Sequence, residues 1–117
     1  MSALDLIKIE KGQVLFNEGD LSEQMYFLKS GKLKVTRNLD DKEVVLGNVT
    51  PGELVGEISF FDKNPRTATV VADEDSELAV IPAEKFKTIF DELPSWYQVL
   101  TNTLIKRVRN ADHQDIT

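Results

Sequence analysis

Short apolar runs alternate with turn-forming residues over the first two thirds of the chain, a pattern that predicts β-strands. Six runs rich in β-branched and aromatic residues are expected to be strands, at residues 14–16, 25–28, 33–37, 44–49, 68–72 and 77–81. The apolar residues of segment 2–9 suit either a short helix or an edge strand. Many short strands separated by turn signals indicate a β-sandwich or barrel.

Glycine, proline and polar clusters mark the expected turns. All six glycines fall between residues 12 and 56, and most are expected to lie where a strand turns: Gly12, Gly19, Gly31, Gly47, Gly52 and Gly56. Glycine supplies the positive φ that tight turns require. Residues 38–42 are expected to form a polar hairpin tip, the pair Pro51-Gly52 another turn, and residues 73–77 a third.

The pattern changes to helical spacing after residue 81. Pro82 suits a first helical turn, and apolar residues follow at helical spacing, namely Phe86, Ile89, Phe90 and Leu93. Pro94 begins a second apolar helical run, which is expected to fray at residues 110–113. Strands followed by helices is the order of an antiparallel β roll with helices grouped at one end. We therefore predict one mainly β domain over residues 1–117, with the roll at about 10–81 and the helices at about 82–112.

Composition narrows the function classes. The 117 residues are 41% hydrophobic, with no apolar run of membrane-spanning length and no signal-like N-terminus, so we expect a cytoplasmic domain without a membrane partner. The absence of cysteine excludes thiol catalysis, and one histidine, His113, disfavours a histidine-based metal site or catalytic triad. A net charge of −6 disfavours binding to DNA over a broad face. No arrangement predicts an enzyme.

The connection between two predicted strands at residues 55–70 is longer than a simple hairpin turn. Gly56 allows close approach of the backbone to a ligand, and segment 57–61 can form one helical turn whose free N–H groups favour an anion. Arg66 supplies a planar, permanently charged fork suited to phosphate oxygens. Glu57 can accept hydrogen bonds from hydroxyls but would repel a phosphate. Together these residues predict a site for a sugar phosphate.

The same residues resemble the phosphate-binding cassette of cyclic-nucleotide-binding domains. The motifs are Gly-Glu-Ile-Ser-Phe-Phe at residues 56–61 and Pro-Arg-Thr-Ala-Thr-Val at residues 65–70, with the arginine nine residues after the glutamate. The family includes regulatory subunits of cyclic-nucleotide-dependent kinases, gated ion channels and bacterial catabolite-activator transcription factors. The resemblance spans roughly residues 8–112 and implies an antiparallel β jelly roll (a double-stranded β-helix) followed by C-terminal helices.

The resemblance implies that the ligand is cAMP or cGMP, with no metal and no other cofactor. Arg66 and the N–H groups around residues 56–58 and Ala68 are expected to hold the cyclic phosphate, and Glu57 the ribose 2′-hydroxyl. Three residues match positions that line the base or ribose in the transcription-factor branch: Leu46, Gly47 and Ile58. The expected ligand-binding residues are Leu46, Gly47, Gly56, Glu57, Ile58, Ser59, Pro65, Arg66, Thr67 and Ala68.

Base selection is left open by the sequence. Thr67 is either a β-branched residue that opens a strand or, as in cyclic-GMP-dependent kinases, a hydroxyl that reaches the phosphate and a guanine amine. In the transcription-factor branch, paired hydroxyl side chains of the C-terminal helix contact the base, whereas Ala111 and Asp112 stand at the matching positions here. Cyclic AMP and cyclic GMP therefore both stay candidates.

The predicted function is a stand-alone sensor that binds a cyclic nucleotide and signals in trans to a partner protein. In the family, binding draws the cassette inward and re-seats the C-terminal helices. Most members continue into an effector at about the point where this chain ends, at Thr117. The alternative is a degenerate domain that keeps the fold as a protein–protein interaction module without nucleotide binding.

Homodimerisation through the C-terminal helix is a further hypothesis. The spacings of Tyr97, Leu100, Leu104 and Ala111 suit a helix that pairs with its twin, although Arg107 interrupts this apolar stripe.

Overall fold

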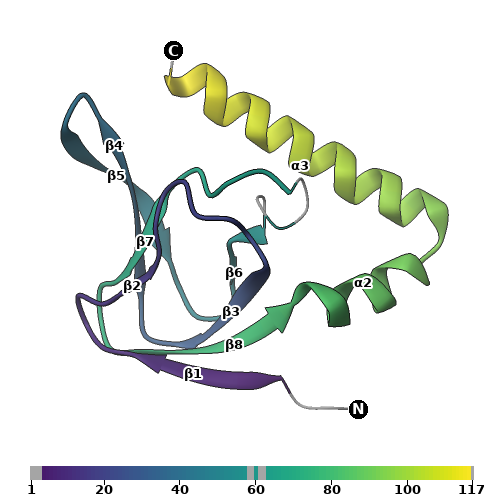
Figure 1. Cartoon of the computed structure of the whole chain (residues 1–117), viewed down its shortest axis with the longest axis horizontal. Coiled ribbons are helices and arrows are strands. Elements are labelled where there is room, and N and C mark those ends of the chain that lie inside the picture. The colour runs from purple at the N-terminus through teal and green to yellow at the C-terminus, as the bar shows by residue number, and fades with distance from the viewer. Residues whose placement is uncertain (1–3, 58–59, 61–62, 117) are drawn as a thin grey trace.

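The computed structural model describes residues 4–57, 60 and 63–116, with the side chains of all of these except residues 109 and 111–116. The described chain is mainly β, as predicted, and two helices follow the strands (Figure 1). The elements are β1 (Asp5–Ile9), β2 (Val14–Phe16), β3 (Gln24–Ser30), β4 (Leu33–Leu39), β5 (Lys42–Val49), β6 (Leu54–Val55), β7 (Thr69–Ala72), β8 (Ser76–Pro82), α2 (Ala83–Asp91) and α3 (Ser95–Ile116).

Two four-stranded antiparallel sheets form the roll, in the orders β1-β8-β3-β6 and β2-β7-β4-β5. Both orders join strands that are far apart in the sequence, so the jelly-roll fold class is confirmed. The core contains side chains from both sheets, including the fully buried Leu28, Leu33 and Leu78. Removing such apolar surface from water is the main term that stabilises a domain of this size.

The structure resolves the N-terminal segment as a strand. Residues 5–9 form β1, an edge strand that pairs antiparallel with β8 from Asp5↔Val80 to Ile9↔Ser76. Its exposed and buried positions suit an edge, because only one side of the ladder is paired and Ile9 alone is fully buried. The predicted polar turn at residues 73–77 is shorter than expected, since β8 already begins at Ser76.

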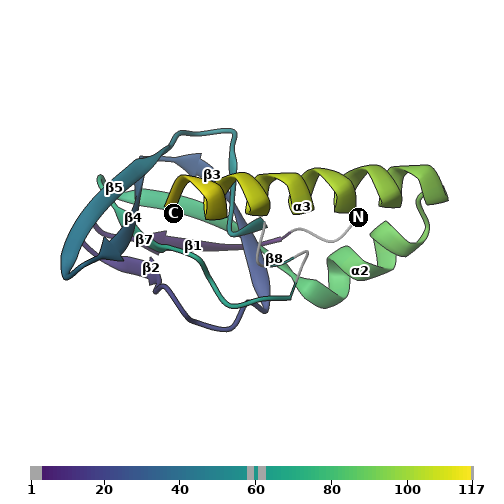
Figure 2. The same ribbon diagram turned by 90° about the horizontal axis from the view of Figure 1, so that it is seen from above.

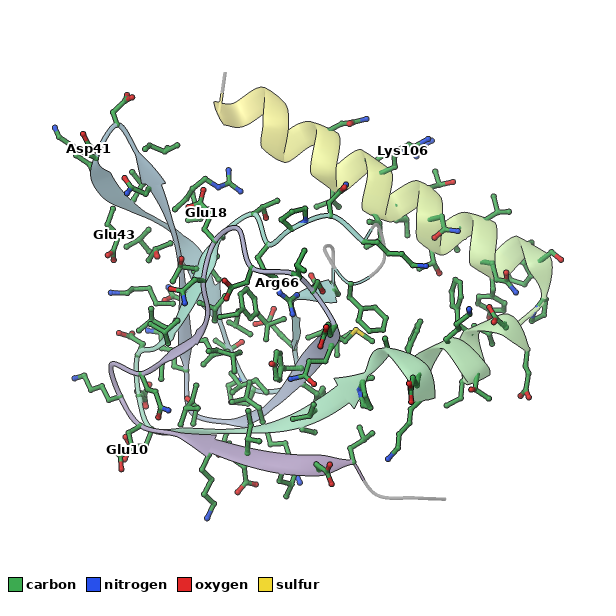
Figure 3. The ribbon with its side chains drawn as sticks, viewed as in Figure 1. Glu10, Glu18, Asp41, Glu43, Arg66 and Lys106 are labelled. Atoms are coloured by element: carbon green, nitrogen blue, oxygen red, sulfur yellow. The ribbon has the colours of Figure 1, made fainter. Side chains whose placement is uncertain are left out.

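The hairpin between β4 and β5 is tighter than predicted. Its tip consists of Asp40 and Asp41, with φ values of 52° and 64°. Positive φ at both central residues is the geometry of a two-residue type I′ turn, whose twist matches that of the flanking strands. Figure 3 shows Asp41 at the end of this hairpin, which projects beyond the roll.

Gly47 lies inside β5, in agreement with the strand predicted at residues 44–49, and is therefore not one of the glycines at a turn. Gly47 pairs with Val35 and Val45 pairs with Thr36, so Leu46 is the extra residue of a β-bulge. A bulge places two residues of one strand opposite one residue of its partner and breaks the strict alternation of faces. A glycine in a strand interior often marks such a bulge.

The two helices begin where the prolines predicted. Pro82 is the N-cap residue of α2, and α3 begins directly after Pro94. The expected fraying at residues 110–113 is wrong for the backbone, which stays helical to Ile116. In both views α3 turns back from α2 toward the side of the β4–β5 hairpin (Figures 1 and 2). Among the described residues, no helix combines the length and apolarity needed to cross a membrane.

Candidate functional site

A cavity of about 260 Å³ lies between the β4–β5 pair, β6 and the segment that precedes β7. Seven of the residues predicted from the sequence line it: Leu46, Gly47, Gly56, Glu57, Arg66, Thr67 and Ala68. Pro65 is exposed and is not part of this lining. Ile58 and Ser59 lie outside the described residues, as do the side chains of Ala111 and Asp112.

The bulge of β5 explains how two neighbouring residues both reach the cavity. In a regular strand Leu46 and Gly47 would face opposite sides of the sheet. Because Leu46 is the extra residue of the bulge, both line the same cavity. The apolar wall formed by Leu46 continues with Leu54 and Val55 of β6.

Arg66 is a buried polar side chain of the cavity with several contacts that hold it in place. It is only 5% exposed, and Figure 3 shows it in the interior of the roll. Its Nη1 donates to the carbonyl oxygen of Gly56 at 2.7 Å, and its Nη2 donates to the carbonyl oxygen of Gln24. Its guanidinium carbon lies 4.0 Å from the centre of the Phe16 ring, a cation–π contact.

The residues around Arg66 also contact one another. The Phe16 ring stacks on Tyr26 with centroids 6.3 Å apart, and the Tyr26 hydroxyl accepts from Nε2 of Gln24 at 2.7 Å. The backbone of Arg66 is held as well, since its N–H donates to Asp20 and its carbonyl accepts from Gly19, each at 2.8 Å. The guanidinium therefore has a fixed position before any ligand arrives.

One hydrogen-bond donor of this guanidinium is left over. Nε of Arg66 is buried and has no hydrogen-bond partner among the described residues. Burial lowers the pKa of the Arg66 guanidinium, and the charges of Asp20 and Glu57 among others oppose that shift. Arginine nevertheless stays protonated in proteins, so the cavity is lined by a buried positive charge.

Gly56 is required by geometry. Its φ of +82° is disfavoured for other residues, and an added Cβ would lie 2.5 Å from Nη1 of Arg66. The sequence predicted that this glycine admits a ligand to the backbone. In the structure it admits the guanidinium of Arg66, to which it also offers its carbonyl oxygen.

Glu57 begins the helical turn predicted for residues 57–61, of which Glu57 and Phe60 are described as helical. The Phe60 N–H donates to the Gly56 carbonyl oxygen at 3.3 Å, an i to i−4 bond. Burial raises the pKa of the Glu57 carboxyl, and its own backbone N–H and the charge of Arg66 only partly offset this. The cavity therefore combines a buried cation with a half-buried carboxylate whose charged form is disfavoured.

Sequence reasoning missed several residues that line the cavity. Two of them matter for its charged groups: Phe16, whose ring contacts the Arg66 guanidinium, and Arg37. Arg37 is a buried arginine of β4 that lines the cavity. A signal for it was present, because Leu33, Val35 and Arg37 share one face of an alternating strand. No sequence signal pointed to Phe16, since its contact with Arg66 joins residues fifty positions apart.

Metal ligands are not grouped in the described part of the chain. No cluster of three or more histidine, cysteine, aspartate or glutamate side chains there is arranged to hold a metal ion.

Comparison with known proteins gives one family. The family model for the cyclic nucleotide-binding domain matches residues 6–92. A cyclic AMP receptor protein from Thermus thermophilus is 37% identical over 103 residues, which are 87% of this chain and 48% of that protein. Lysophospholipase nte1 from Aspergillus terreus is 31% identical over 116 residues, which are 98% of this chain and 8% of that protein.

Solved structures agree with these relatives. The cAMP-bound form of the EAL enzyme Bd1971 superposes with a TM-score of 0.87 at 28% identity, over 95% of this chain and 30% of that one. Its cGMP-bound form gives a TM-score of 0.85 at 28% identity, over 94% of this chain and 30% of that one. This chain thus spans about half the length of the receptor protein, and a small part of the lysophospholipase and the EAL enzyme.

Proposed function

Because the chain belongs to the cyclic nucleotide-binding domain family, which its matching family model and its relatives establish, we propose that it is a non-catalytic sensor of cAMP or cGMP. The ligand occupies the cavity beside Arg66. The resemblance drawn from residues 56–61 and 65–70 is confirmed at the level of the family. The choice between the two nucleotides, the residues that contact them and the route of the signal belong to the proposal.

The buried guanidinium of Arg66 is the observation that carries the proposal. It lines the cavity, is fixed by two carbonyl oxygens and the Phe16 ring, and keeps a buried Nε without a partner among the described residues. A buried donor that lacks an acceptor is costly. In the proposed complex a phosphate oxygen accepts from this guanidinium, and the pair forms a charge-assisted hydrogen bond.

The other cavity residues take complementary parts of the ligand. Glu57 accepts from the ribose 2′-hydroxyl, and the N–H groups at the start of its helical turn and of Ala68 face the phosphate. Leu46 and Leu54 cover the base with apolar surface. Bd1971 is described in both cAMP-bound and cGMP-bound forms, so likeness to it supports either nucleotide here.

Calorimetric titration with cAMP and with cGMP tests the proposal. We expect heat of binding with at least one of them and a dissociation constant in the micromolar range or below. Absence of both heat and any rise in melting temperature at millimolar ligand would refute the sensor function and favour an interaction module. The same titration decides which nucleotide binds more tightly.

Replacement of Arg66 tests the site. Arg66→Lys keeps the charge but loses the fork, and we expect affinity to fall about 10–150-fold, the range for a charged hydrogen bond. The affinity of Arg66→Ala should fall at least as far. This variant also loses the hydrogen bonds to Gly56 and Gln24, so its melting curve must show that it is folded. Wild-type affinity in a folded Arg66→Lys variant would place the phosphate elsewhere.

α3 is the proposed site of homodimerisation. Apolar side chains at helical spacing are about half exposed along this helix: Tyr97, Leu100, Leu104 and Val108. An exposed apolar stripe of this kind on a helix surface is typical of a helix that packs against another. We assign it to a second copy of this chain, because a regular stripe suits a symmetric helix pair. A dimer of this kind then offers its partner protein two sensors at once.

A further inference from the structure

Arg37 is a buried charged side chain whose position requires an explanation. It belongs to β4, is 6% exposed and lines the same cavity as Arg66. Moving a charged group out of water carries an effective penalty of several kcal/mol unless it is paired and hydrogen-bonded. A side chain that only filled the strand face beside Val35 would not need a charge. We therefore expect the guanidinium of Arg37 to make polar interactions that an apolar side chain could not make.

A hydrogen bond of Arg37 continues the β4–β7 ladder beyond the last paired backbone residues. Strands β4 and β7 are paired from Leu33↔Ala72 to Thr36↔Thr69, and β7 begins at Thr69. Beyond that pair, Nε of Arg37 donates to the carbonyl oxygen of Thr67 at 2.7 Å. A side chain of β4 thus holds the chain over the next two residues, where the sheet no longer does.

Thr67 is the neighbour of Arg66, so this bond also bears on the guanidinium. On its other side the segment is held by the reciprocal backbone bonds of Arg66 with Gly19 and Asp20. The backbone that carries Arg66, Thr67 and Ala68 is therefore fixed from two directions, by the β2–β3 connection and by β4. Loss of the β4 contact leaves one of these supports.

We infer that Arg37 is a positioning residue of the ligand site, which holds the Arg66–Ala68 segment against β4 through Thr67 and adds a second positive charge to the cavity. The inference rests on the proposed function, since it presumes an anionic ligand beside Arg66. Among the described residues that line the cavity, Glu57 is the carboxylate, and Arg37 and Arg66 are the two arginines.

The test compares three variants by calorimetry with whichever of cAMP and cGMP the wild type binds more tightly. Arg37→Met keeps the aliphatic stem and removes both donor and charge, so we expect affinity about 10-fold weaker or more. Arg37→Lys keeps a charge and a donor and should stay within about 5-fold of the wild type. The matched control is Lys34→Met, on the same strand but outside the cavity lining, where Lys34 only pairs with Glu43 at 3.9 Å.

A double-mutant cycle separates positioning from mere stability. If Arg37 acts through the Arg66 segment, Arg37→Met combined with Arg66→Lys should lose less affinity than the product of the two single losses. Multiplicative losses, or an affinity of Arg37→Met equal to that of the control, overturn the inference. Where Arg37→Met does not fold, Arg37→Gln replaces it with the same two outcomes. A wild type that binds neither nucleotide refutes the proposed function itself, whereas binding that ignores Arg37 refutes only this inference.

Discussion

At the scale of single residues, contacts within the domain hold the guanidinium of Arg66 in place in the cavity. Arg66 is fixed by Gly56, Gln24 and the Phe16 ring, so its guanidinium loses little freedom when a ligand binds. Pre-organisation of this kind raises affinity because the ordering entropy has already been met by folding. This arrangement has a cost in the ligand-free domain, because two buried cations and a half-buried carboxylate lie in one cavity.

Glu57 is the residue of this set whose charged form is disfavoured by burial, and its titration predicts how the stability of the domain depends on pH. Burial raises the pKa of this carboxyl in the folded domain, so its contribution to stability is present below the unfolded pKa and is lost as pH rises through the folded pKa. At neutral pH the apo domain therefore bears a penalty. Glu57→Gln should raise its melting temperature at pH 7, and this gain should disappear as the pH approaches about 4.5. Thermal melts of both proteins across this pH range provide the measurement.

Ligand affinity should respond in the opposite direction. The charged carboxylate is the better acceptor for a ribose hydroxyl, so Glu57→Gln should weaken binding of the cyclic nucleotide about 10–150-fold at pH 7. Wild-type affinity should also decrease as the pH falls through the raised pKa of Glu57, and the variant should lack this step. Titrations with the matching 2′-deoxy cyclic nucleotide serve as the control. If the variant lost as much affinity for the deoxy ligand as for the ribose ligand, Glu57 would not contact that hydroxyl.

At the scale of elements, the segment that carries the site also touches the helices. The ring of Phe60, three residues after Glu57, meets Phe86 of α2 edge-on with centroids 5.2 Å apart, and Phe86 stacks on Phe90 at 5.4 Å. Such a pair is worth about 0.5–1.5 kcal/mol beyond the burial of its surface. A displacement of Phe60 would therefore act on Phe86 of α2. We infer that the proposed binding of a nucleotide in the cavity would reach α2 through this contact.

Removing this contact should separate binding from the helix response. Trp96, the only tryptophan in the sequence, is 62% exposed at the start of α3 and stacks on Tyr97, so its fluorescence reports on that helix. Phe60→Ala should keep affinity within about 5-fold, because Phe60 is not among the residues that line the cavity, but reduce the ligand-induced fluorescence change to less than half. Ile89→Ala, at an exposed position of α2, is the matched control. An undiminished signal in Phe60→Ala would show that α3 responds by another route.

At the scale of the whole molecule, the described residues divide into a packed roll and a sparsely packed helix. Core residues of the two sheets such as Leu28 and Leu78 are fully buried, whereas α3 exposes apolar side chains over most of its described length. A helix that buries little of its apolar surface gains little stability from its own domain. The proposed dimer would cover this surface.

This proposal predicts a self-association that one charge disrupts. Leu104→Glu, in the middle of the apolar stripe, should raise the dimer dissociation constant at least about 10-fold, since it places a carboxylate in an apolar interface. Sedimentation velocity over a range of protein concentrations measures this. Asn102→Glu introduces the same charge on another face of α3 and should sediment like the wild type. A wild-type chain that stays monomeric at high concentration would assign the stripe to a different protein.

The sequence by itself was sufficient for what depends on local pattern and on short spacings. Alternation and turn residues predicted six of the eight strands that the structure describes, because the period of side-chain facing is a local property of the backbone. Pro82 and Pro94 predicted where the helices begin, because proline restricts its own φ, which is also a local property. The nine-residue spacing from Glu57 to Arg66 identified the family, and seven of the ten predicted site residues line one cavity.

Only the tertiary structure decided how that cavity is assembled. The bulge at Leu46 and Gly47 depends on the register with β4, and the supports of Arg66 come from Phe16, Gln24 and the β2–β3 connection. Arg37 reaches Thr67 across thirty positions of sequence. Such contacts arise from sheets that pair distant strands, and no window of neighbouring residues contains them. The sequence thus identified the groups suited to a cyclic phosphate, and the packing of the roll decided which of them are held in place to meet it.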